Sequence, residues 1–208
     1  MVYARNAIWD IAKSLNVDYF LVLDDDYTKF KYVADENNCY KNMICNNLDS
    51  VFNAFIKYLI ASSAESIAML QGGDLMGGSH NAVIREGLVK RKVMNTFFCS
   101  TERRFKFVGR INEDVNTYVW LGTQGKLFLQ IPDIRMDQSQ TQSNSGGLTE
   151  FYLDIGTYSK SFYTVMFAPS CVKVSMMGTN YQRLHHRISW NNVCPKIINQ
   201  KHRIDSGS

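Results

Sequence analysis

An unbroken apolar run that ends in three consecutive acids is the feature that most constrains the fold. Residues 18–23 read DYFLVL, and Asp24, Asp25 and Asp26 follow directly. Such a run is typical of a short strand that is buried on both faces, as in a parallel or mixed sheet. Ligand sites in α/β sheets lie beyond the carboxyl ends of strands, so the acids are predicted to lie at a binding edge.

Strand patterns alternate with helix patterns along the rest of the chain. Strands are predicted for residues 18–23, 27–33, 66–71, 93–98, 105–108, 126–131 and 170–176. Helices are predicted for residues 3–15, 47–62, 112–121 and 149–155, with a flexible loop at 137–147. This alternation predicts an α/β fold, in which a mixed sheet is flanked by helices around one core.

Charge is unevenly distributed along the 208 residues, whose formal net charge is +4. Residues 67–110 and 181–208 carry +5 and +4, whereas residues 1–66 and 111–180 carry −3 and −2. A basic face can attract a polyanion such as nucleic acid or a nucleotide diphosphate, but solvated surface lysines and arginines would give the same pattern.

The cysteines and the hydropathy bear on the compartment. Five cysteines without a CxxC pair indicate neither a zinc site nor a disulfide framework, which favours a reducing, intracellular setting such as the cytoplasm. No apolar run reaches the roughly 18 residues that a membrane span needs, so we expect no membrane partner.

The acid triplet is predicted to bind a divalent cation. Three adjacent carboxylates repel one another, which raises their pKa values unless a cation compensates. Asp24 and Asp26 point to the same side of an extended strand, so both can reach one hard ion such as Mg²⁺ or Mn²⁺. An acidic turn or helix cap after the strand is the alternative.

A second acidic pair, Glu113 and Asp114, begins the helix predicted over 112–121, and Asn112 is placed to cap it. Stabilisation by the helix dipole would by itself explain two acids in a first turn. The functional alternative is a general base that takes the proton of a hydroxyl nucleophile. Nearby arginines would either orient an anionic partner or neutralise the acids: Arg103, Arg104 and Arg110.

A glycine pair and a histidine pair complete the candidate site. Gly72 and Gly73 follow a predicted strand, where glycine permits close ligand approach, so they form either an active-site loop or plain turn glycines. His185 and His186 lie in the basic tail. One imidazole could meet a cation at Asp26, whereas a surface or packed histidine is the simpler interpretation.

Together these segments resemble a known family. VDYFLVLDDDY resembles the Asp-x-Asp strand of glycosyltransferases with the GT-A fold. The order of LDDDY, QGGDLMGG, GRINEDVNTY, SGGLTEFY and HHRISW followed by PKII resembles the TET/JBP-associated glycosyltransferases, the proposed DNA glycosyltransferases of phages and of base J synthesis. The resemblance extends from about Arg5 to Arg203.

This resemblance implies a single GT-A-like domain over residues 1–203 and a flexible tail at 204–208. A GT-A domain normally has strands before the Asp-x-Asp strand that hold the uracil and the ribose. Only 23 residues precede Asp24 here. We therefore expect those nucleotide-binding strands to be missing and activity to be impaired.

The resemblance also implies a UDP-sugar donor, Mn²⁺ or Mg²⁺, and a hydroxymethylated pyrimidine in DNA as the acceptor of a hexosyl or pentosyl group. The implied donor contacts are Arg5, Asn6, Asp24, Asp25, Gly72 and Gly73. The implied metal ligands are Asp26, Asp24, His185 and His186. The implied base is Asp114, or Glu113 in its place.

The implied mechanism is direct displacement at the anomeric carbon, in which the base deprotonates the acceptor and the metal stabilises the departing diphosphate. The basic segment 85–110 and the tail would hold the DNA backbone, and Tyr118 or Trp120 would stack on a flipped base. Three alternatives stay open: a glycosyltransferase for a glycan or protein acceptor, a non-catalytic binding domain that retains the fold, and a nucleotidyltransferase. The sequence leaves the sugar, the stereochemical outcome and the oligomeric state open.

Overall fold

The computed structural model describes residues 2–34, 40–75, 96–138, 158–177 and 182–193. Some predictions lie outside these residues, namely the helix at 149–155, most of the loop at 137–147, the tail at 204–208 and the first residues of the strand at 93–98.

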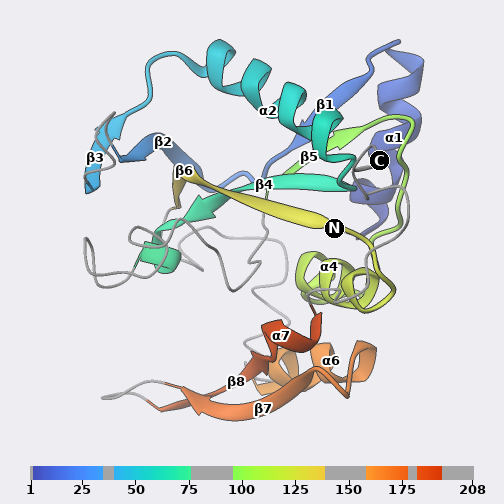
Figure 1. Ribbon diagram of the computed structural model, residues 1–208. Coiled ribbons are helices and arrows are strands. Elements are labelled where there is room, and N and C mark those ends of the chain that lie inside the picture. Colours follow the sequence, from blue (N-terminus) through green and yellow to red (C-terminus); the bar gives the residue numbers. More distant parts are fainter. Residues whose placement is uncertain (1, 35–39, 76–95, 139–157, 178–181, 194–208) are drawn as a thin grey trace, which may run out of the picture.

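Six strands form one mixed sheet in the order β1-β5-β4-β6-β2-β3 (Figure 1). They are β1 (Tyr19–Val22), β2 (Tyr27–Ala34), β3 (Tyr40–Ile44), β4 (Ser66–Gln71), β5 (Phe97–Ser100) and β6 (Phe128–Gln138). β4 and β6 are parallel, and the other neighbouring pairs are antiparallel. β1, β4 and β6 therefore run in the same direction, and their carboxyl ends lie at one edge.

Helices flank both faces of this sheet, which confirms the predicted α/β architecture. In Figure 1, α2 (Leu48–Ser62) lies on one side of the strands and α4 (Glu113–Thr123) on the other. α1 (Val2–Ser14) packs beside β1, and the short 3-10 helix η1 (Gly72–Leu75) follows β4. No helix within the described ranges is long and apolar enough to cross a membrane.

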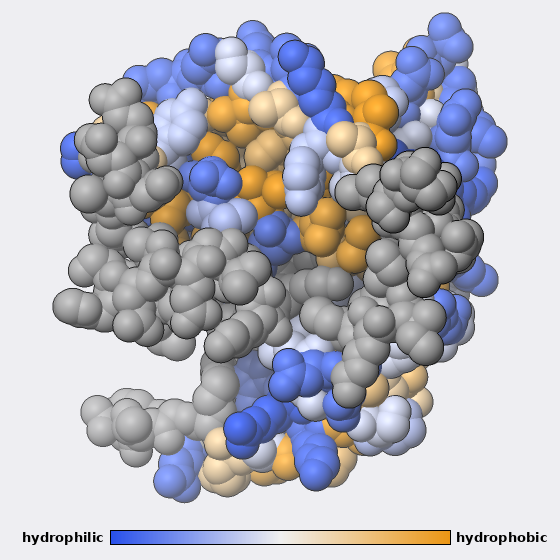
Figure 2. Space-filling model, in the orientation of Figure 1, coloured by the Kyte–Doolittle hydropathy of each residue, from blue (hydrophilic) through white to orange (hydrophobic). Residues whose placement is uncertain are grey.

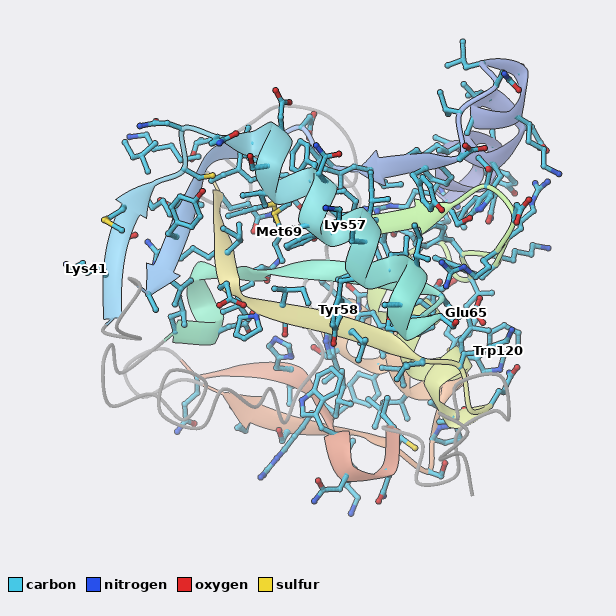
Figure 3. The ribbon with its side chains drawn as sticks, turned by 45° about the horizontal axis from the view of Figure 1, so that its top comes forward. Lys41, Lys57, Tyr58, Glu65, Met69 and Trp120 are labelled. Atoms are coloured by element: carbon cyan, nitrogen blue, oxygen red, sulfur yellow. The ribbon has the colours of Figure 1, made fainter. Side chains whose placement is uncertain are left out.

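Alternation along β4 shows how the sheet fills two cores. Ile67 and Met69 are fully buried on the face that α2 covers (Figure 3), whereas Ala68 joins the cluster around Trp9 on the opposite face. A strand buried on both faces needs a continuous apolar sequence, which is the pattern of residues 66–71. Trp9 anchors α1 by donating its indole N–H to the carbonyl of Ser100 at 3.3 Å.

Hydrophobic residues also gather on the surface over α2 and the adjoining sheet, as Figure 2 shows. A groove of about 500 Å³ opens there, lined by Val51, Phe55, Ile131 and Ile134 among others.

A second, two-stranded sheet stands apart from the first and consists of β7 (Val172–Met177) and β8 (Arg183–Ile188). α6 (Tyr158–Phe167) packs against both strands, and the short α7 (Trp190–Val193) packs against α4. Val172 and Val193 are buried in the same cluster as Tyr118 of α4, so α4 joins the two sheets.

Several sequence predictions were wrong in detail. The segment 105–108 is not a strand, because Asn6 and Thr117 side chains, not a neighbouring strand, bind the backbone N–H groups of Phe107 and Val108. Asn112 does not cap α4 with its side chain; it adopts a left-handed conformation (φ 52°). β3 and β8 were not predicted.

Candidate active site

Four carboxylates and one arginine converge beyond the carboxyl edge of the sheet. Asp24 and Asp26 follow β1, and Glu113 and Asp114 form the first turn of α4. Burial raises the pKa of Asp24, and Asp114, Asp26 and Glu113 lie close enough to add to that rise. The structure therefore brings both predicted acidic groups into one site.

Arg5 of α1 is the cation at the centre of this cluster. Its side chain is only 5 % exposed. Nη2 donates to Oδ1 of Asp24 at 2.5 Å, and Nε donates to Oε1 of Glu113 at 3.0 Å. The guanidinium also lies 5.7 Å and 5.4 Å from the ring centroids of Phe97 and Phe107. One buried side chain thus ties three separate parts of the chain together.

Asp24 is an acid whose ionisation is disfavoured by its surroundings in this site. Burial raises the pKa of its carboxyl to about 6, and the three neighbouring acids add to that rise. Arg5 opposes the shift, but its attraction is outweighed by the desolvation and the like charges. Tyr27 places its hydroxyl 3.5 Å from Oδ2 of Asp24, at the long limit for a hydrogen bond. The site therefore holds more negative charge than its internal arginine neutralises.

Asp26 is oriented from the end of a different strand. Both of its carboxylate oxygens accept from Nε2 of Gln138, at 3.2 Å and 3.1 Å. Gln138 ends β6, and it pairs with Tyr27 in the sheet. Asp25, between the two clustered acids, is exposed. The segment that follows β1 thus crosses the edge of the sheet from β1 to β2.

The two acids of α4 have different surroundings. Glu113 is buried and bound to Arg5, whereas Asp114 is half-buried. Burial raises the pKa of Asp114, and Glu113 adds to the rise. Arg5, a hydrogen bond from the backbone N–H of Val115, and Lys160 act in the opposite direction. A carboxyl whose pKa is raised is a better proton acceptor near neutral pH, which is the property of a general base.

The predicted glycine loop lies at the same edge. Gly72 and Gly73 begin η1 directly after β4. Asp74, which follows the paired glycines and for which no separate role was predicted, is buried and fixes this turn. Its Oδ2 accepts from the backbone N–H of Gln71 and from Nε2 of Gln130, both at 3.0 Å. An acid after paired glycines is the signal that could have identified it.

A comparison with models of protein families identifies the family of the chain. The family model of the TET-Associated Glycosyltransferase matches residues 1–147. The chain belongs to this family. The matched region covers most of the 208 residues and contains the whole acidic cluster together with Arg5. It confirms the family that the sequence resembles, and the motifs expected beyond residue 147 stay predictions. Searches among curated proteins and among solved structures gave no match. Membership implies glycosyltransferase activity.

In this TET-associated glycosyltransferase, Asn6 links α1 to the segment before α4. Its Nδ2 donates to the carbonyl of Phe107 at 3.0 Å, and its Oδ1 accepts from the N–H of the same residue at 2.8 Å. The placement of Arg5 and Asn6 gives both residues roles inside the protein that the resemblance did not imply. That they contact the donor nucleotide stays a prediction.

Two of the arginines after β5, Arg103 and Arg104, bind groups outside the acidic pair. Arg103 donates to the carbonyls of Leu59 (3.0 Å) and Ala64 at the end of α2. Arg104 forms an exposed ion pair with Asp10, at 2.7 Å between Nη1 and Oδ1. The cation that neutralises Glu113 lies 108 residues away in the sequence, so charge spacing alone did not reveal it.

The histidine pair lies on β8 in the small sheet, beyond the region that the family model matches. Burial lowers the pKa of His186 to about 4, with His185 and Lys160 contributing. Lys160 of α6 also acts on Asp114, so α6 lies between the histidines and the acids. Within the described parts of the chain, no group of three or more side chains has the arrangement of a metal site. Metal ligation by His185 or His186 stays a prediction.

The two expected stacking residues differ in access. Tyr118 is 2 % exposed and stacks on Trp190, with ring centroids 5.9 Å apart. It cannot stack on a flipped base without leaving the core, so that expectation was wrong. Trp120 is 36 % exposed, but it stands six residues after Asp114 on α4 and so faces a different side of the helix.

Proposed function

We propose that this chain transfers a sugar from a UDP-sugar to the hydroxymethyl group of a modified pyrimidine in DNA, with the help of a divalent metal ion. The observation that carries the proposal is the acidic cluster around Arg5 at the carboxyl edge of the sheet. Family membership supports the glycosyltransferase class, and the donor, metal and acceptor are inferred from the chemistry of this site together with the family resemblance.

The donor set fits a hard divalent cation. Asp24, Glu113 and Asp114 act on the Arg5 guanidinium, Asp26 acts on Asp24, and burial in these surroundings raises the pKa of Asp24 to about 6. Mg²⁺ is commonly held by one or two carboxylates together with substrate phosphates and water. Asp24 and Asp26 would hold it, and the amide of Gln138 would orient Asp26 as an outer partner does in metal sites. When bound, the ion supplies Lewis-acid stabilisation of the diphosphate leaving group.

Asp114 is the better candidate for the base, because Glu113 is already bound to Arg5. The raised pKa of Asp114 suits removal of a proton from a hydroxyl group as the hydroxyl attacks the anomeric carbon. Lys160 lies close enough to lower that pKa again and would stabilise the carboxylate before the reaction. The chain's own contribution is therefore to orient the acceptor oxygen and accept its proton.

The donor would lie across the edge of the sheet. We infer that its sugar and ribose contact Asp24 and Asp25 and that its diphosphate approaches the backbone of Gly72 and Gly73, which carry no side chain of their own. We also infer that the protein acts where hydroxymethylated DNA and UDP-sugars occur together, which is the cytoplasm, including that of a phage-infected host.

The decisive experiment incubates the protein with Mn²⁺, DNA that contains 5-hydroxymethylated pyrimidines, and each of several UDP-sugars. After digestion of the DNA to nucleosides, mass spectrometry should show the mass of one hexosyl or pentosyl group on the modified base. Unmodified DNA and EDTA-treated protein should give no product. UDP release at the same rate with and without DNA would show hydrolysis only and would count against the DNA acceptor.

Two substitutions test the assigned roles. Asp26→Asn should abolish the metal-dependent activity, and Asp114→Asn should abolish transfer while UDP binding persists. Asp10→Asn is a matched control, because Asp10 is an exposed acid that pairs with Arg104 outside the cluster. Normal transfer by both site variants would refute the assignment.

A further inference from the structure

A second hollow lies beside the acidic cluster and is not used by the proposed chemistry. This groove has a volume of about 970 Å³ and lies between α1, the segment 106–110 and α6. Its lining residues include Tyr3, Asn6, Lys106, Arg110, Tyr163 and Phe167.

The groove combines positive charge with aromatic surface. Lys106 and Arg110 are both exposed, and none of the described residues that line the groove is acidic. The side chain of Tyr3 is 87 % exposed, whereas Trp9 on the same helix is fully buried. Cations beside aromatic rings are the combination that binds the phosphates and bases of an unpaired nucleic-acid strand.

The geometry of α6 connects this groove to the candidate base. Lys160, Tyr163 and Phe167 are spaced by three and four residues, so they share one face of the helix. Lys160 acts on the pKa of Asp114, whereas Tyr163 and Phe167 line the groove. One face of α6 therefore has Lys160 near Asp114 at one end and, one to two turns further along, Tyr163 and Phe167 in the groove.

The groove wall on the side of Arg110 is held in place. The hydroxyl of Tyr163 accepts from the backbone N–H of Arg110 at 2.9 Å. Gly109 next to it has φ 89°, and a Cβ at that position would meet Nδ2 of Asn116 at 2.4 Å. A wall that is fixed before binding loses little entropy when a ligand docks.

We propose that this groove binds the stretch of acceptor strand next to the target nucleotide. The inference rests on the proposed function, because it supplies the track along which the DNA reaches Asp114. Lys106 and Arg110 bind backbone phosphates, and Tyr3 stacks on a neighbouring base. The donor diphosphate is a poorer occupant, since Asp24 and Asp26, which are expected to hold its metal ion, do not line the groove.

The test measures binding of a fluorescent single-stranded oligonucleotide that contains one 5-hydroxymethylcytosine, by anisotropy and over a range of salt concentrations. Replacing both cations, Lys106→Glu with Arg110→Glu, should weaken binding at least about ten-fold and lower the salt slope by about 1.4, since each phosphate contact contributes about 0.7 for single strands. Tyr3→Ala should weaken binding about ten-fold, and Tyr3→Phe should restore it, because stacking needs only the ring.

Lys57→Glu is the matched control, because Lys57 is an exposed cation on α2 (Figure 3) and does not line the groove. It should bind the oligonucleotide as the unchanged protein does. UDP binding in the presence of Mn²⁺ should be the same in all variants. If the double variant binds the oligonucleotide as tightly as Lys57→Glu does, or if it loses UDP instead, the inference is overturned.

A free 5-hydroxymethylated nucleoside separates this inference from the proposed function. Transfer to the nucleoside should survive the groove substitutions, since it needs the acids but no flanking strand. If the protein modifies the nucleoside but the groove substitutions leave oligonucleotide affinity unchanged, only the groove inference is overturned. Failure to modify either acceptor would overturn the proposed function, and the oligonucleotide titration would still decide for or against the groove.

Discussion

Nη2 of Arg5 lies 2.5 Å from Oδ1 of Asp24, and this ion pair joins the first helix to the acids that follow β1. The same guanidinium holds Glu113 at 3.0 Å. A residue near the start of the chain therefore fixes the relative positions of two acidic groups that lie 89 residues apart, from 24 to 113. Because the acids repel one another, the positive charge of Arg5 helps to hold the site together.

Arg5→Met should lower the free energy of unfolding by about 3 kcal/mol, since removing one partner of a buried ion pair leaves the other charges uncompensated. Urea denaturation followed by circular dichroism measures the change. Arg104→Met is the control, because Arg104 pairs with Asp10 at the exposed surface and its loss should alter stability little. Equal losses in the two variants would contradict a structural role for Arg5.

Stability should fall as the pH rises through the range of about 4 to 6. The pKa of Asp24 is raised in the folded protein to about 6 from an ordinary value of 3.8. In this window the folded state binds more protons than the unfolded state, so each step to higher pH favours unfolding. Thermal melts between pH 4 and pH 7 should show this trend, and Asp24→Asn should flatten it. An unchanged slope in the variant would assign the trend to another group.

Divalent ions should offset the loss of folding stability that ionised Asp24 causes. Mn²⁺ should raise the melting temperature at pH 7, where Asp24 is ionised, and much less at pH 5, where it is largely protonated. Asp26→Asn should remove most of the effect, whereas Asp10→Asn should preserve it. A stabilisation by Mn²⁺ that is the same at both pH values would argue against binding by these carboxylates.

Asp114→Asn should lower kcat for transfer by about two to four orders of magnitude, the usual contribution of a general base. The affinity for UDP should stay close to that of the unchanged protein, because the base faces the acceptor. Steady-state kinetics with hydroxymethylated DNA and equilibrium titration with UDP measure the two effects. A loss confined to UDP affinity would move Asp114 to the donor side.

Gly109→Ala should destabilise the fold by about 2 kcal/mol or more, since an alanine there is strained by φ 89° and its Cβ would meet Asn116 at 2.4 Å. Gly125→Ala is matched in backbone strain, with φ 83° after the end of α4. The difference between the two urea midpoints isolates the steric clash. If both variants lose the same stability, the clash at Gly109 is relieved by movement of Asn116.

Individual helices and strands were predictable because their apolar residues recur at regular spacings along the chain. Residues 66–71 form β4 as predicted, and the helix predicted over 3–15 is α1. Residue 112 shows the limit of such reasoning. A capping side chain was expected, but Asn112 instead donates to the carbonyl of Lys160 and to the hydroxyl of Thr164 on α6. Hydrogen bonds to a helix that is distant in the sequence thus replaced the local capping hydrogen bond.

The sequence by itself determined which residues are acidic, which runs are apolar, and that an apolar strand ends in Asp24, Asp25 and Asp26. The order of its motifs along the chain indicated the family. Only the tertiary structure decided which acids meet. β1, β4 and β6 place their carboxyl ends at one edge, and that common edge lets Gln138 reach Asp26. The burial of Arg5 between Asp24 and Glu113 was likewise decided by packing, because a charge's partners depend on distances in space that spacing along the chain does not encode.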